Sequence, residues 1–218
     1  LIPADVQELK AAFATGKALR KSCVLVKDAP AFVVNRLLTR FLGEVTRSVD
    51  EGTPFEVADS ALDPLGLPMS PFVLLQLVGP AVAFHVSETM HDAYPDRFYV
   101  SDNLRRGVEA GISGLWAYDA QGNRSIDPKV AEVFVQGDAP LTAEQVSDRA
   151  LKALAEEIQI MLDEGVVAEV QDIDMCMILG AGWGFHLGGV SPYLDRSGVS
   201  EKVNGRRFLA PGIASVPA

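Results

Sequence analysis

Apolar and polar positions alternate in two different ways at the start of the chain. Residues 3–20 place their apolar side chains on one side of a helix, which predicts an amphipathic helix. Residues 23–26, Cys-Val-Leu-Val, form a short apolar run before the breaker Lys-Asp-Ala-Pro, which predicts a strand. A single strand cannot form a sheet, because its edges stay unpaired. We therefore interpret residues 1–27 as the last piece of a sheet domain that this sequence lacks.

A long helix is predicted next. Its start is expected near Pro30, with Asp28 as the cap and the proline in the first turn. Its end is expected at Gly52, because glycine commonly terminates helices. The apolar stripe that predicts this helix consists of Val34, Leu38, Phe41, Val45 and Val49.

A shorter helix and a broken helix follow. Thr53 is predicted to cap the shorter one, with Glu56 completing a capping box. Residues 63–71 are rich in proline and glycine and predict a turn region. Residues 72–93 predict a helix that is interrupted at Gly79, which precedes a proline.

The helical period then stops and restarts. The Gln-Gly-Asn sequence at 121–123 suggests a hairpin-like turn, and we place a linker at 119–140. Thr142 and Gln145 form a second capping box that begins another long helix, which is expected to end at Gly165. Its predicted apolar stripe consists of Val146, Ala150, Leu154, Ile158 and Leu162.

The two long helices belong to a repeat. The Asp-Glu-Gly sequence at 50–52 recurs at 163–165, an offset of 113 residues. Residues 35–62 share nine identities with the residues 113 positions later, where chance would give roughly two. A repeat of this length is not a solenoid. Two related copies can instead pack about a pseudo-twofold axis, as subunits do in a symmetric dimer.

The repeat defines the predicted architecture. We expect an all-α fold of two tandem, duplicated helical domains, preceded by the helix-strand remnant at 1–27. The first helical domain is assigned to 28–118 and the second to 141–218, with the linker at 119–140 between them.

The composition excludes several classes of partner. The chain has 218 residues, of which 48% are hydrophobic and 22% charged, so it can form a substantial core. Its net charge of -10 repels phosphate backbones and anionic lipids, so we expect no nucleic-acid or membrane partner. The most apolar stretch, 73–86, is too short and interrupted to span a bilayer. Cys23 and Cys176 cannot form a disulfide framework and fit a reducing compartment, so a cytoplasmic location is expected.

Three segments carry a family resemblance. Residues 26–38, VKDAPAFVVNRLL, resemble the Val-x-Lys-Asp-x-Pro-Gly-Phe-Val-Val-Asn-Arg pattern of L-3-hydroxyacyl-CoA dehydrogenases, with Ala31 in place of the usual glycine. Residues 66–79, GLPMSPFVLLQLVG, are similar to the family's Pro-Met-Gly-Pro-Phe segment, with Gln76 in place of an aspartate. Residues 180–198, GAGWGFHLGGVSPYLDRSG, resemble a glycine-rich segment of multifunctional fatty-acid oxidation enzymes. Together they point to the multifunctional α-chain of β-oxidation.

The resemblance implies an activity and a catalytic residue. In that family NAD-dependent oxidation converts an L-3-hydroxyacyl-CoA to the 3-ketoacyl-CoA, and a His-Glu pair in the NAD-binding domain removes the hydroxyl proton. The family's asparagine, which corresponds to Asn35, binds the substrate and that histidine. An amide suits this role because it donates, accepts and does not titrate. At the repeated position the second copy has Asp148, so at most one copy need be catalytic.

The resemblance also implies partners and a substrate path. Met69, Pro71 and Phe72 either line the path of the acyl or pantetheine group or pack at the start of a helix. The implied partners are the acyl-CoA substrate, a NAD-binding domain and an enoyl-CoA hydratase domain outside this sequence, and a thiolase subunit. No Gly-x-Gly-x-x-Gly follows a strand in this chain. We therefore expect that the chain alone neither binds NAD nor turns over.

Competing interpretations remain open from the residues alone. Asn35 could be a surface residue of its helix, and the duplicated unit could be an assembly module without its own catalysis. A helical domain of another dehydrogenase class is a third option. His85 and His91, six residues apart, lie on different faces of a helix, which disfavours a metal site. Asp172 and Asp174 form either a paired carboxylate site or helix caps.

Overall fold

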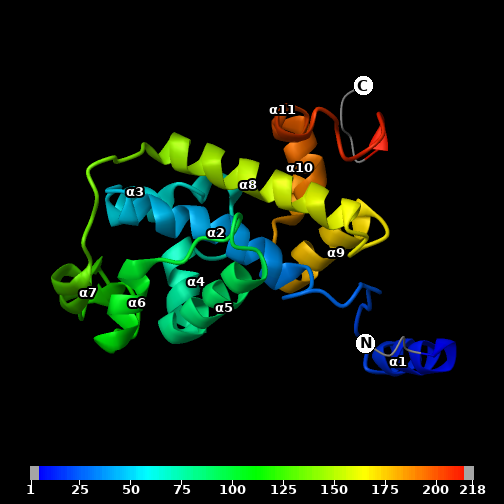
Figure 1. Ribbon diagram of the computed structural model, residues 1–218, viewed down its shortest axis with the longest axis horizontal. Coiled ribbons are helices and arrows are strands. Elements are labelled where there is room, and N and C mark those ends of the chain that lie inside the picture. The colour runs from blue at the N-terminus through cyan, green and yellow to red at the C-terminus, as the bar shows by residue number, and fades with distance from the viewer. Residues whose placement is uncertain (1–4, 214–218) are drawn as a thin grey trace.

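The computed structural model describes residues 5–213, which form a mainly helical fold, as the sequence predicts (Figure 1). The single sheet in the described residues is a two-stranded hairpin. The helices of the N-terminal half are α1 (Val6–Ala18), α2 (Val34–Asp50), α3 (Phe55–Ser60), η1 (Asp63–Leu65), α4 (Pro71–Val78), α5 (Pro80–Ala93) and α6 (Asp102–Glu109). They are followed by β1 (Trp116–Tyr118), β2 (Arg124–Ile126), α7 (Pro128–Val133), α8 (Ala143–Asp163), α9 (Val170–Ala181), η2 (Phe185–Leu187), α10 (Val190–Arg196) and α11 (Val199–Asn204).

The N-terminal segment lies apart from the rest of the molecule (Figure 1). Helix α1 forms where the period predicts it, but none of its residues is buried, and Val6 is 63% exposed. The strand predicted at 23–26 does not form. No described segment pairs with residues 23–26, and just after them Lys27 N–H donates a backbone bond to the carbonyl of Val166. A strand needs a neighbouring strand to bond its backbone groups. The β propensity of residues 23–26 was therefore not sufficient to form one here.

The core lies between α2 and α8, which run antiparallel side by side (Figure 1). The predicted stripe of α2 is confirmed at Phe41, Val45 and Val49, which are buried, whereas Val34 and Leu38 are partly exposed and Leu37 is buried instead. On α8 the predicted positions are buried except the last, Leu162, whose place is taken by Met161. The buried face of α8 consists of Val146, Ala150, Leu154, Ile158 and Met161.

The two long helices begin differently. Helix α8 has the predicted capping box of Thr142 and Gln145. Helix α2 begins at Val34, not near Pro30, and no side chain caps it, so the prediction of Asp28 as its cap was wrong. The physical reason is the backbone of Ala31 and Phe32, which has φ values of 59° and 52°. This left-handed turn cannot belong to a right-handed helix.

The start of α3 also departs from its prediction. Pro54 occupies the N-cap position and no side chain caps the helix, so the capping box of Thr53 and Glu56 is not formed. The buried Thr53 hydroxyl instead accepts a hydrogen bond from Leu141 N–H at 2.9 Å. Thr53 therefore ties the segment before α8 to the end of α2, a role that depends on a residue 88 positions away.

Two further local predictions are confirmed. The helix predicted at 72–93 breaks at Gly79 into α4 and α5, which are bent by 99°. The turn predicted at 121–123 joins β1 to β2, which pair antiparallel with Trp116 opposite Ile126.

Among the described residues no single helix is long and apolar enough to cross a bilayer. The segment assigned to the linker contains β2 and α7.

Reciprocal ion pairs join α2 and α8. Arg36 Nε lies 2.6 Å from Glu157, and Arg149 Nε lies 3.2 Å from Glu44. The offset of 113 residues converts the first pair into the second, with the roles of the helices exchanged. Such reciprocity is the property of an interface with twofold symmetry. A second set follows the same rule: Arg36–Glu164 at 2.9 Å and Arg149–Glu51 at 2.5 Å.

A buried aspartate stabilises a helix start in each copy. Asp59 accepts bonds from Phe72 N–H and the Ser70 hydroxyl, both at 2.8 Å, at the start of α4. Asp174 accepts bonds from the N–H and hydroxyl of Ser191, at 2.7 and 2.5 Å, at the start of α10. By the offset of 113 residues, however, the equivalent of Asp59 is Asp172 and not Asp174. The two copies therefore lose their common register after the long helices.

Candidate functional site

An uncharged groove runs along one face of α2. Helices α4, α5 and α6 form its other walls, and its cavity volume is about 240 Å³. The stripe that α2 contributes begins in its first turn and follows helical spacing as far as Thr46: Asn35, Leu38, Thr39, Leu42, Gly43 and Thr46. No residue that lines the groove carries a charge. The groove is therefore suited to an apolar ligand.

Asn35 lies at one end of this groove, in the first turn of α2. The left-handed turn at Ala31 and Phe32 delays the start of the helix and so places Asn35 there. The side chain is exposed, and its amide has no hydrogen-bond partner among residues 5–213. An amide offers donors and an acceptor. Asn35 is thus free to bind a ligand that enters the groove.

Polar groups deeper in the groove are already satisfied. The Thr46 hydroxyl donates to the Leu42 carbonyl and the Ser87 hydroxyl donates to the Phe84 carbonyl. The Tyr99 hydroxyl donates to Asp50 at 2.8 Å. Burial and then this bond raise the pKa of Tyr99, so the phenol stays neutral. The Ser101 hydroxyl accepts a bond from Leu104 N–H at 3.0 Å. Among the polar side chains that line the groove, Asn35 and Thr39, one turn apart, are the two that make no hydrogen bond within residues 5–213.

The three residues that the sequence suggested for a substrate path line two cavities, and Pro71 belongs to both. Pro71 and Phe72 line the groove together with Asn35. Phe72 is also a core residue, 2% exposed, and its ring centroid lies 6.2 Å from that of Phe55. Met69 does not line the groove but a smaller cavity beside Trp183, between the two copies. The path and packing interpretations both apply to Phe72.

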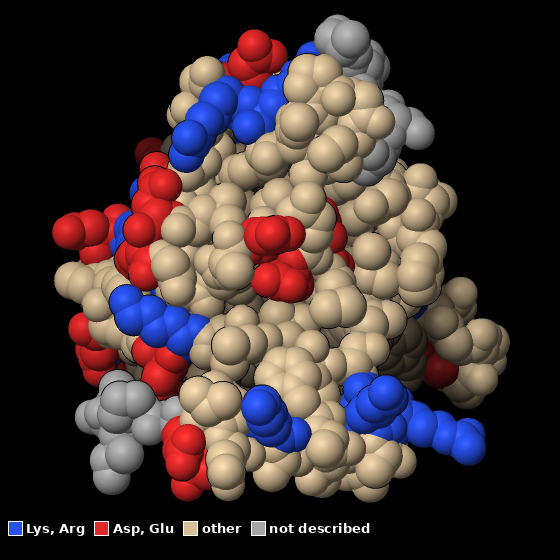
Figure 2. Space-filling view, turned by 90° about the vertical axis from the view of Figure 1, so that its right-hand side faces the viewer, with Lys and Arg blue, Asp and Glu red and all other residues tan. Residues whose placement is uncertain are grey.

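Asn35 also borders a second hollow, of about 420 Å³, between α9 and the segment that precedes α2. Phe32 and Leu179, which are 54% and 58% exposed, lie on its rim. Burial raises the pKa of the Cys176 thiol in its wall, and Asp172 adds to the effect. Figure 2 shows that much of the end of the molecule that carries α1 and α9 is uncharged. Asn35 therefore stands between two apolar surfaces.

The remaining candidates have structural roles. Arg36 is fully buried and pairs with Glu157 and Glu164, so its role is to join the two long helices. Burial would lower the pKa of Arg36, but these two carboxylates raise it above its ordinary value. His91 bonds the Phe98 carbonyl at 2.7 Å and His85 is exposed. Among the described residues no group of histidine, cysteine or acidic side chains could hold a metal ion.

The two aspartates of α9 are explained by helix capping. Asp174 stabilises the start of α10 through Ser191. Burial raises the pKa of Asp174 above the ordinary value, although the bonds from Ser191 act in the opposite direction. Asp172 is half-buried beside Cys176. The capping interpretation therefore holds for Asp174, and the two residues do not form a shared site.

Sequence reasoning missed Gly43, Thr39 and Tyr99. Thr39 and Gly43 lie four and eight residues from Asn35 on the same helical face, so the period of α2 could have identified them. Tyr99 could not be found in this way, because it reaches the groove from the segment before α6.

The described residues do not fit a dinucleotide. Such a site requires a glycine-rich turn between a parallel strand and a helix. The sheet described here is an antiparallel hairpin, and the glycines at 180–184 follow α9 without a strand before them. The described residues therefore lack the strand-turn-helix unit that holds a dinucleotide.

Comparisons with known proteins agree with this geometry. Residues 32–117 match the family described as 3-hydroxyacyl-CoA dehydrogenase, C-terminal domain. The chain is 31% identical over 201 residues to the fatty acid oxidation complex subunit alpha of Acinetobacter baumannii strain SDF, and equally to that of strain AYE. Each alignment covers 84% of this chain and 28% of the relative. The chain thus spans less than a third of the length of these relatives.

A solved structure shares the fold. The crystal structure of 3-hydroxybutyryl-CoA dehydrogenase from Escherichia coli K12 superposes with a TM-score of 0.63 over 98% of this chain and 65% of that one. The sequences are 19% identical. The likeness therefore establishes the fold of the chain and not its substrate.

Proposed function

We propose that this chain, a member of the 3-hydroxyacyl-CoA dehydrogenase family that carries its C-terminal domain over residues 32–117, is the substrate-side part of a larger β-oxidation enzyme. The proposed reaction is the NAD-dependent oxidation of an L-3-hydroxyacyl-CoA to the 3-ketoacyl-CoA. The proposal is supported by the domain match and by relatives named as fatty acid oxidation complex alpha subunits.

The observation that carries the proposal is the position of Asn35. Its amide has no partner in the described part of the chain and stands at the end of an uncharged groove. A substrate with a polar reacting end and an apolar tail can therefore place its oxygen at Asn35 and its tail along α2. The amide keeps the same protonation state throughout the working pH range, so its donor remains available to that oxygen.

The other components are proposed to lie outside this chain. NAD and the proton-accepting histidine belong to a separate NAD-binding domain, which the exposed α1 and the second hollow beside Asn35 could contact. A hydratase domain and a thiolase subunit are the further partners, and the enzyme is placed in the cytoplasm. The length of the relatives, more than three times that of the aligned segment, supports additional domains.

Asn35→Ala tests the assignment once the chain is joined to a NAD-binding domain of the same family. Loss of a preorganised hydrogen-bond donor costs roughly 10²–10³ in kcat. We expect a fall of that order in kcat for acetoacetyl-CoA reduction, with an unchanged melting temperature because the amide has no partner in the described fold.

The matched control is Asp148→Ala, which changes the equivalent position of the second copy. Its side chain pairs with Lys152 on the surface of α8, so turnover should stay at the wild-type rate. Equal turnover in the wild type and Asn35→Ala would exclude Asn35 from the reaction.

A second function, an assembly module, is favoured by one observation. Leu77 and Val82 at the bend between α4 and α5 are 70% and 53% exposed, which is typical of interaction surfaces when such residues cluster. Titration of the isolated chain with acetoacetyl-CoA, together with its mass in solution, separates the two functions. A defined oligomer that does not bind acetoacetyl-CoA would favour assembly.

A further inference from the structure

We propose that the groove along α2 holds the acyl chain of the substrate and that Gly43 sets the length of chain it accepts. This inference rests on the proposed function, because it places the reacting end of the substrate at Asn35. The occupant is an unbranched acyl chain of a CoA thioester, which runs from Asn35 towards Thr46.

The polarity of the groove gives this orientation. The uncommitted polar groups, Asn35 and Thr39, lie at one end. Further along, the hydroxyls of Thr46, Ser87 and Tyr99 bond to other protein groups and offer no donor to a ligand. The Ser101 hydroxyl accepts a bond from Leu104 N–H. A thioester with its 3-oxygen at Asn35 therefore meets, along its tail, apolar side chains and hydroxyls that already make a hydrogen bond to the protein. The apolar walls of the inner part include Leu42, Leu75, Val78, Val82, Val86 and Leu104.

The dimensions suit a medium or long chain. Eleven residues separate Asn35 from Thr46, which is about 16 Å along a helix at about 1.5 Å per residue. Gly43 lies about 12 Å from Asn35 on the same scale. An extended hydrocarbon advances about 1.3 Å per carbon, from the length of a C–C bond and its tetrahedral angle. A tail of about ten carbons therefore reaches Gly43, and a longer tail passes it.

Gly43 is the point at which the groove is held open. A Cβ built on Gly43 meets no other atom within 4 Å, although the residue lies in the middle of α2. Glycine in a helix interior costs about 0.5–1 kcal/mol relative to alanine and no close contact here requires it. Its lack of a side chain instead leaves the groove continuous past this turn of the helix.

The second copy supports this interpretation. The residue 113 positions after Gly43 is Glu156, and the one after Thr39 is Lys152. Lys152 pairs with Asp148, and the Glu156 side chain is 53% exposed and pairs with Arg40. The same face of α8 is thus charged where that of α2 is open and uncharged. The glycine belongs to the copy that has the amide.

Titration calorimetry with butyryl-, octanoyl-, dodecanoyl- and hexadecanoyl-CoA tests the proposal on this chain, with free CoA as the baseline. Each buried methylene contributes about 0.8 kcal/mol, a factor of about four in affinity. We expect the affinity of the wild type to rise from butyryl- to dodecanoyl-CoA. Gly43→Leu should reduce binding of dodecanoyl- and hexadecanoyl-CoA at least tenfold, and that of butyryl-CoA far less. Gly43→Ala should give the same trend with a smaller loss.

The matched control is Glu156→Leu, which adds the same side chain at the equivalent position of α8, outside the groove. It should keep the wild-type dependence on chain length. Thermal unfolding of each variant establishes that it is folded, and Gly43→Ala supplies the result if the leucine variant is not.

The outcomes separate this inference from the proposed function. If the affinity does not rise with chain length, or if Gly43→Leu weakens all four thioesters equally, the groove does not hold the tail, and the dehydrogenase proposal stands. A groove occupied by a helix of another domain would give that second result. If no thioester binds better than free CoA, both proposals fail. If the length dependence holds but Asn35→Ala retains full turnover, only the catalytic assignment of Asn35 fails.

Discussion

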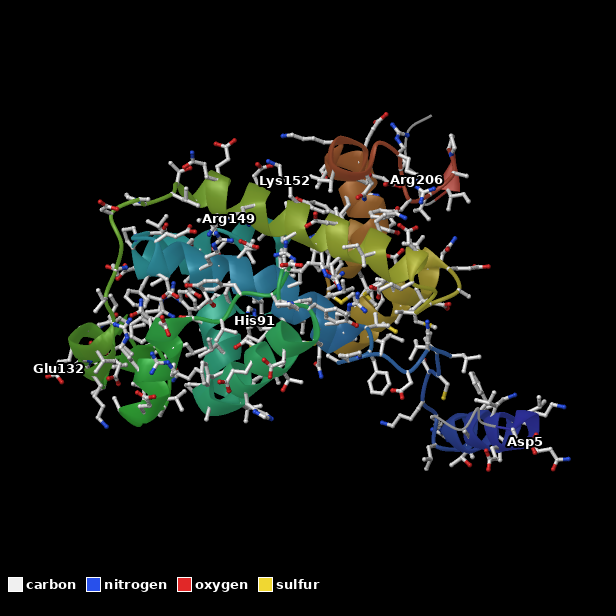
Figure 3. The ribbon with its side chains drawn as sticks, viewed as in Figure 1. Asp5, His91, Glu132, Arg149, Lys152 and Arg206 are labelled. Atoms are coloured by element: carbon white, nitrogen blue, oxygen red, sulfur yellow. The ribbon has the colours of Figure 1, made fainter. Side chains whose placement is uncertain are left out.

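The two long helices, α2 and α8, carry similar residues on the faces that pack together and different residues on the faces that point away from each other. The faces that pack together carry equivalent residues, including the arginines Arg36 and Arg149. On the opposite faces Asn35 corresponds to Asp148 and Thr39 to Lys152. Figure 3 shows Arg149 between the two helices and Lys152 on the side of α8 away from α2. The duplication therefore preserved the interface and left one copy free to lose the groove.

The shared face is not symmetric in burial. Arg36 and Glu157 have fully buried side chains, whereas Arg149 is 27% exposed. Tyr94 accounts for part of the difference, because its ring stacks against both Arg36 and Arg97 at 4.6 and 4.3 Å. Equivalent ion pairs in the two copies should therefore differ in energy, since a desolvated charge without its partner is costly.

The largest expected effect is a difference in the free energy of unfolding between the variants Arg36→Met and Arg149→Met. Breaking a buried pair by removing one partner costs about 3–5 kcal/mol, because the remaining charge stays buried. We expect Arg36→Met to lower the free energy of unfolding by an amount in this range, since Glu157 then keeps only Arg97. Arg149→Met should cost less, on the order of 1 kcal/mol, because Glu44 keeps Arg40 and water reaches the site. Urea denaturation of both variants measures the difference.

Arg47→Met is the control for loss of an arginine. Its pair with Glu51 lies on the surface of α2, so a change below about 1 kcal/mol is expected. Equal losses in Arg36→Met and Arg149→Met would show that the two halves of the interface are energetically symmetric despite their different burial.

The next comparison is between the aspartates that stabilise helix starts, Asp59 and Asp174. Asp59 also accepts bonds from Trp116 Nε1 and Arg124, so it joins α3, α4 and the hairpin. Asp59→Ala leaves several buried donors unpaired and should cost about 2–4 kcal/mol, at about 1–3 kcal/mol for each unsatisfied group. Asp174→Ala removes the bonds from Ser191 and the backbone interaction with Val190, all at the start of α10, and should cost about 1–2 kcal/mol.

Asp59→Ala and Asp174→Ala should also differ in their effect on acyl-CoA binding in the groove. Loss of the Asp59 bonds frees the start of α4, where Pro71 and Phe72 line the groove, so acyl-CoA binding should fall as well. Asp174→Ala should leave binding unaffected. A loss of stability that is larger in Asp174→Ala would contradict the central position of Asp59.

The sequence was sufficient where structure depends on neighbours along the chain. The period of α2 and α8, the break at Gly79, the hairpin and the Thr142 capping box all arise locally and were predicted. Thr53 was not, because its partner is 88 residues away. The strand at 23–26 failed because the described residues contain no partner for it.

The same distinction holds for the site. Asn35 was predicted as a site residue because the family motif that contains it is local in sequence. The helical period places Gly43 on the same face as Asn35, but α4 and α5, which form the opposite walls of the groove, are distant in sequence, so Gly43 was not predicted. A glycine in a helix is by itself only weakly informative. Met69 was grouped with Pro71 and Phe72 because they are close in sequence, but the fold places Met69 and Phe72 on different cavities, and Pro71 lines both.

A smaller effect is expected from the contrasting starts of α2 and α8. Ala31 adopts a φ of 59°, in the region where L residues other than glycine are strained. The left-handed conformation costs roughly 1–2 kcal/mol for a residue with a Cβ, and a glycine avoids this cost. Part of the resulting stabilisation is lost, because glycine also makes the unfolded chain more flexible. Ala31→Gly should therefore raise the free energy of unfolding by about 0.5–1 kcal/mol. Ala143→Gly, in the first turn of α8, should lower it. Stabilisation by both substitutions would contradict the assigned backbone strain.

The smallest expected effect concerns pH and the capping aspartate of the second copy. Burial raises the pKa of Asp174 above its ordinary 3.8. The folded protein therefore binds this proton more tightly than the unfolded chain, so the contribution of Asp174 to stability is fully present below 3.8 and is lost as the pH rises through the folded pKa. Asp174→Asn cannot titrate, so its stability relative to the wild type should improve as the pH rises across this window. Urea midpoints measured at several pH values for both proteins detect this change in slope. Parallel pH profiles would show that the bonds from Ser191 cancel the effect of burial, and a slope of opposite sign would show that these bonds outweigh burial.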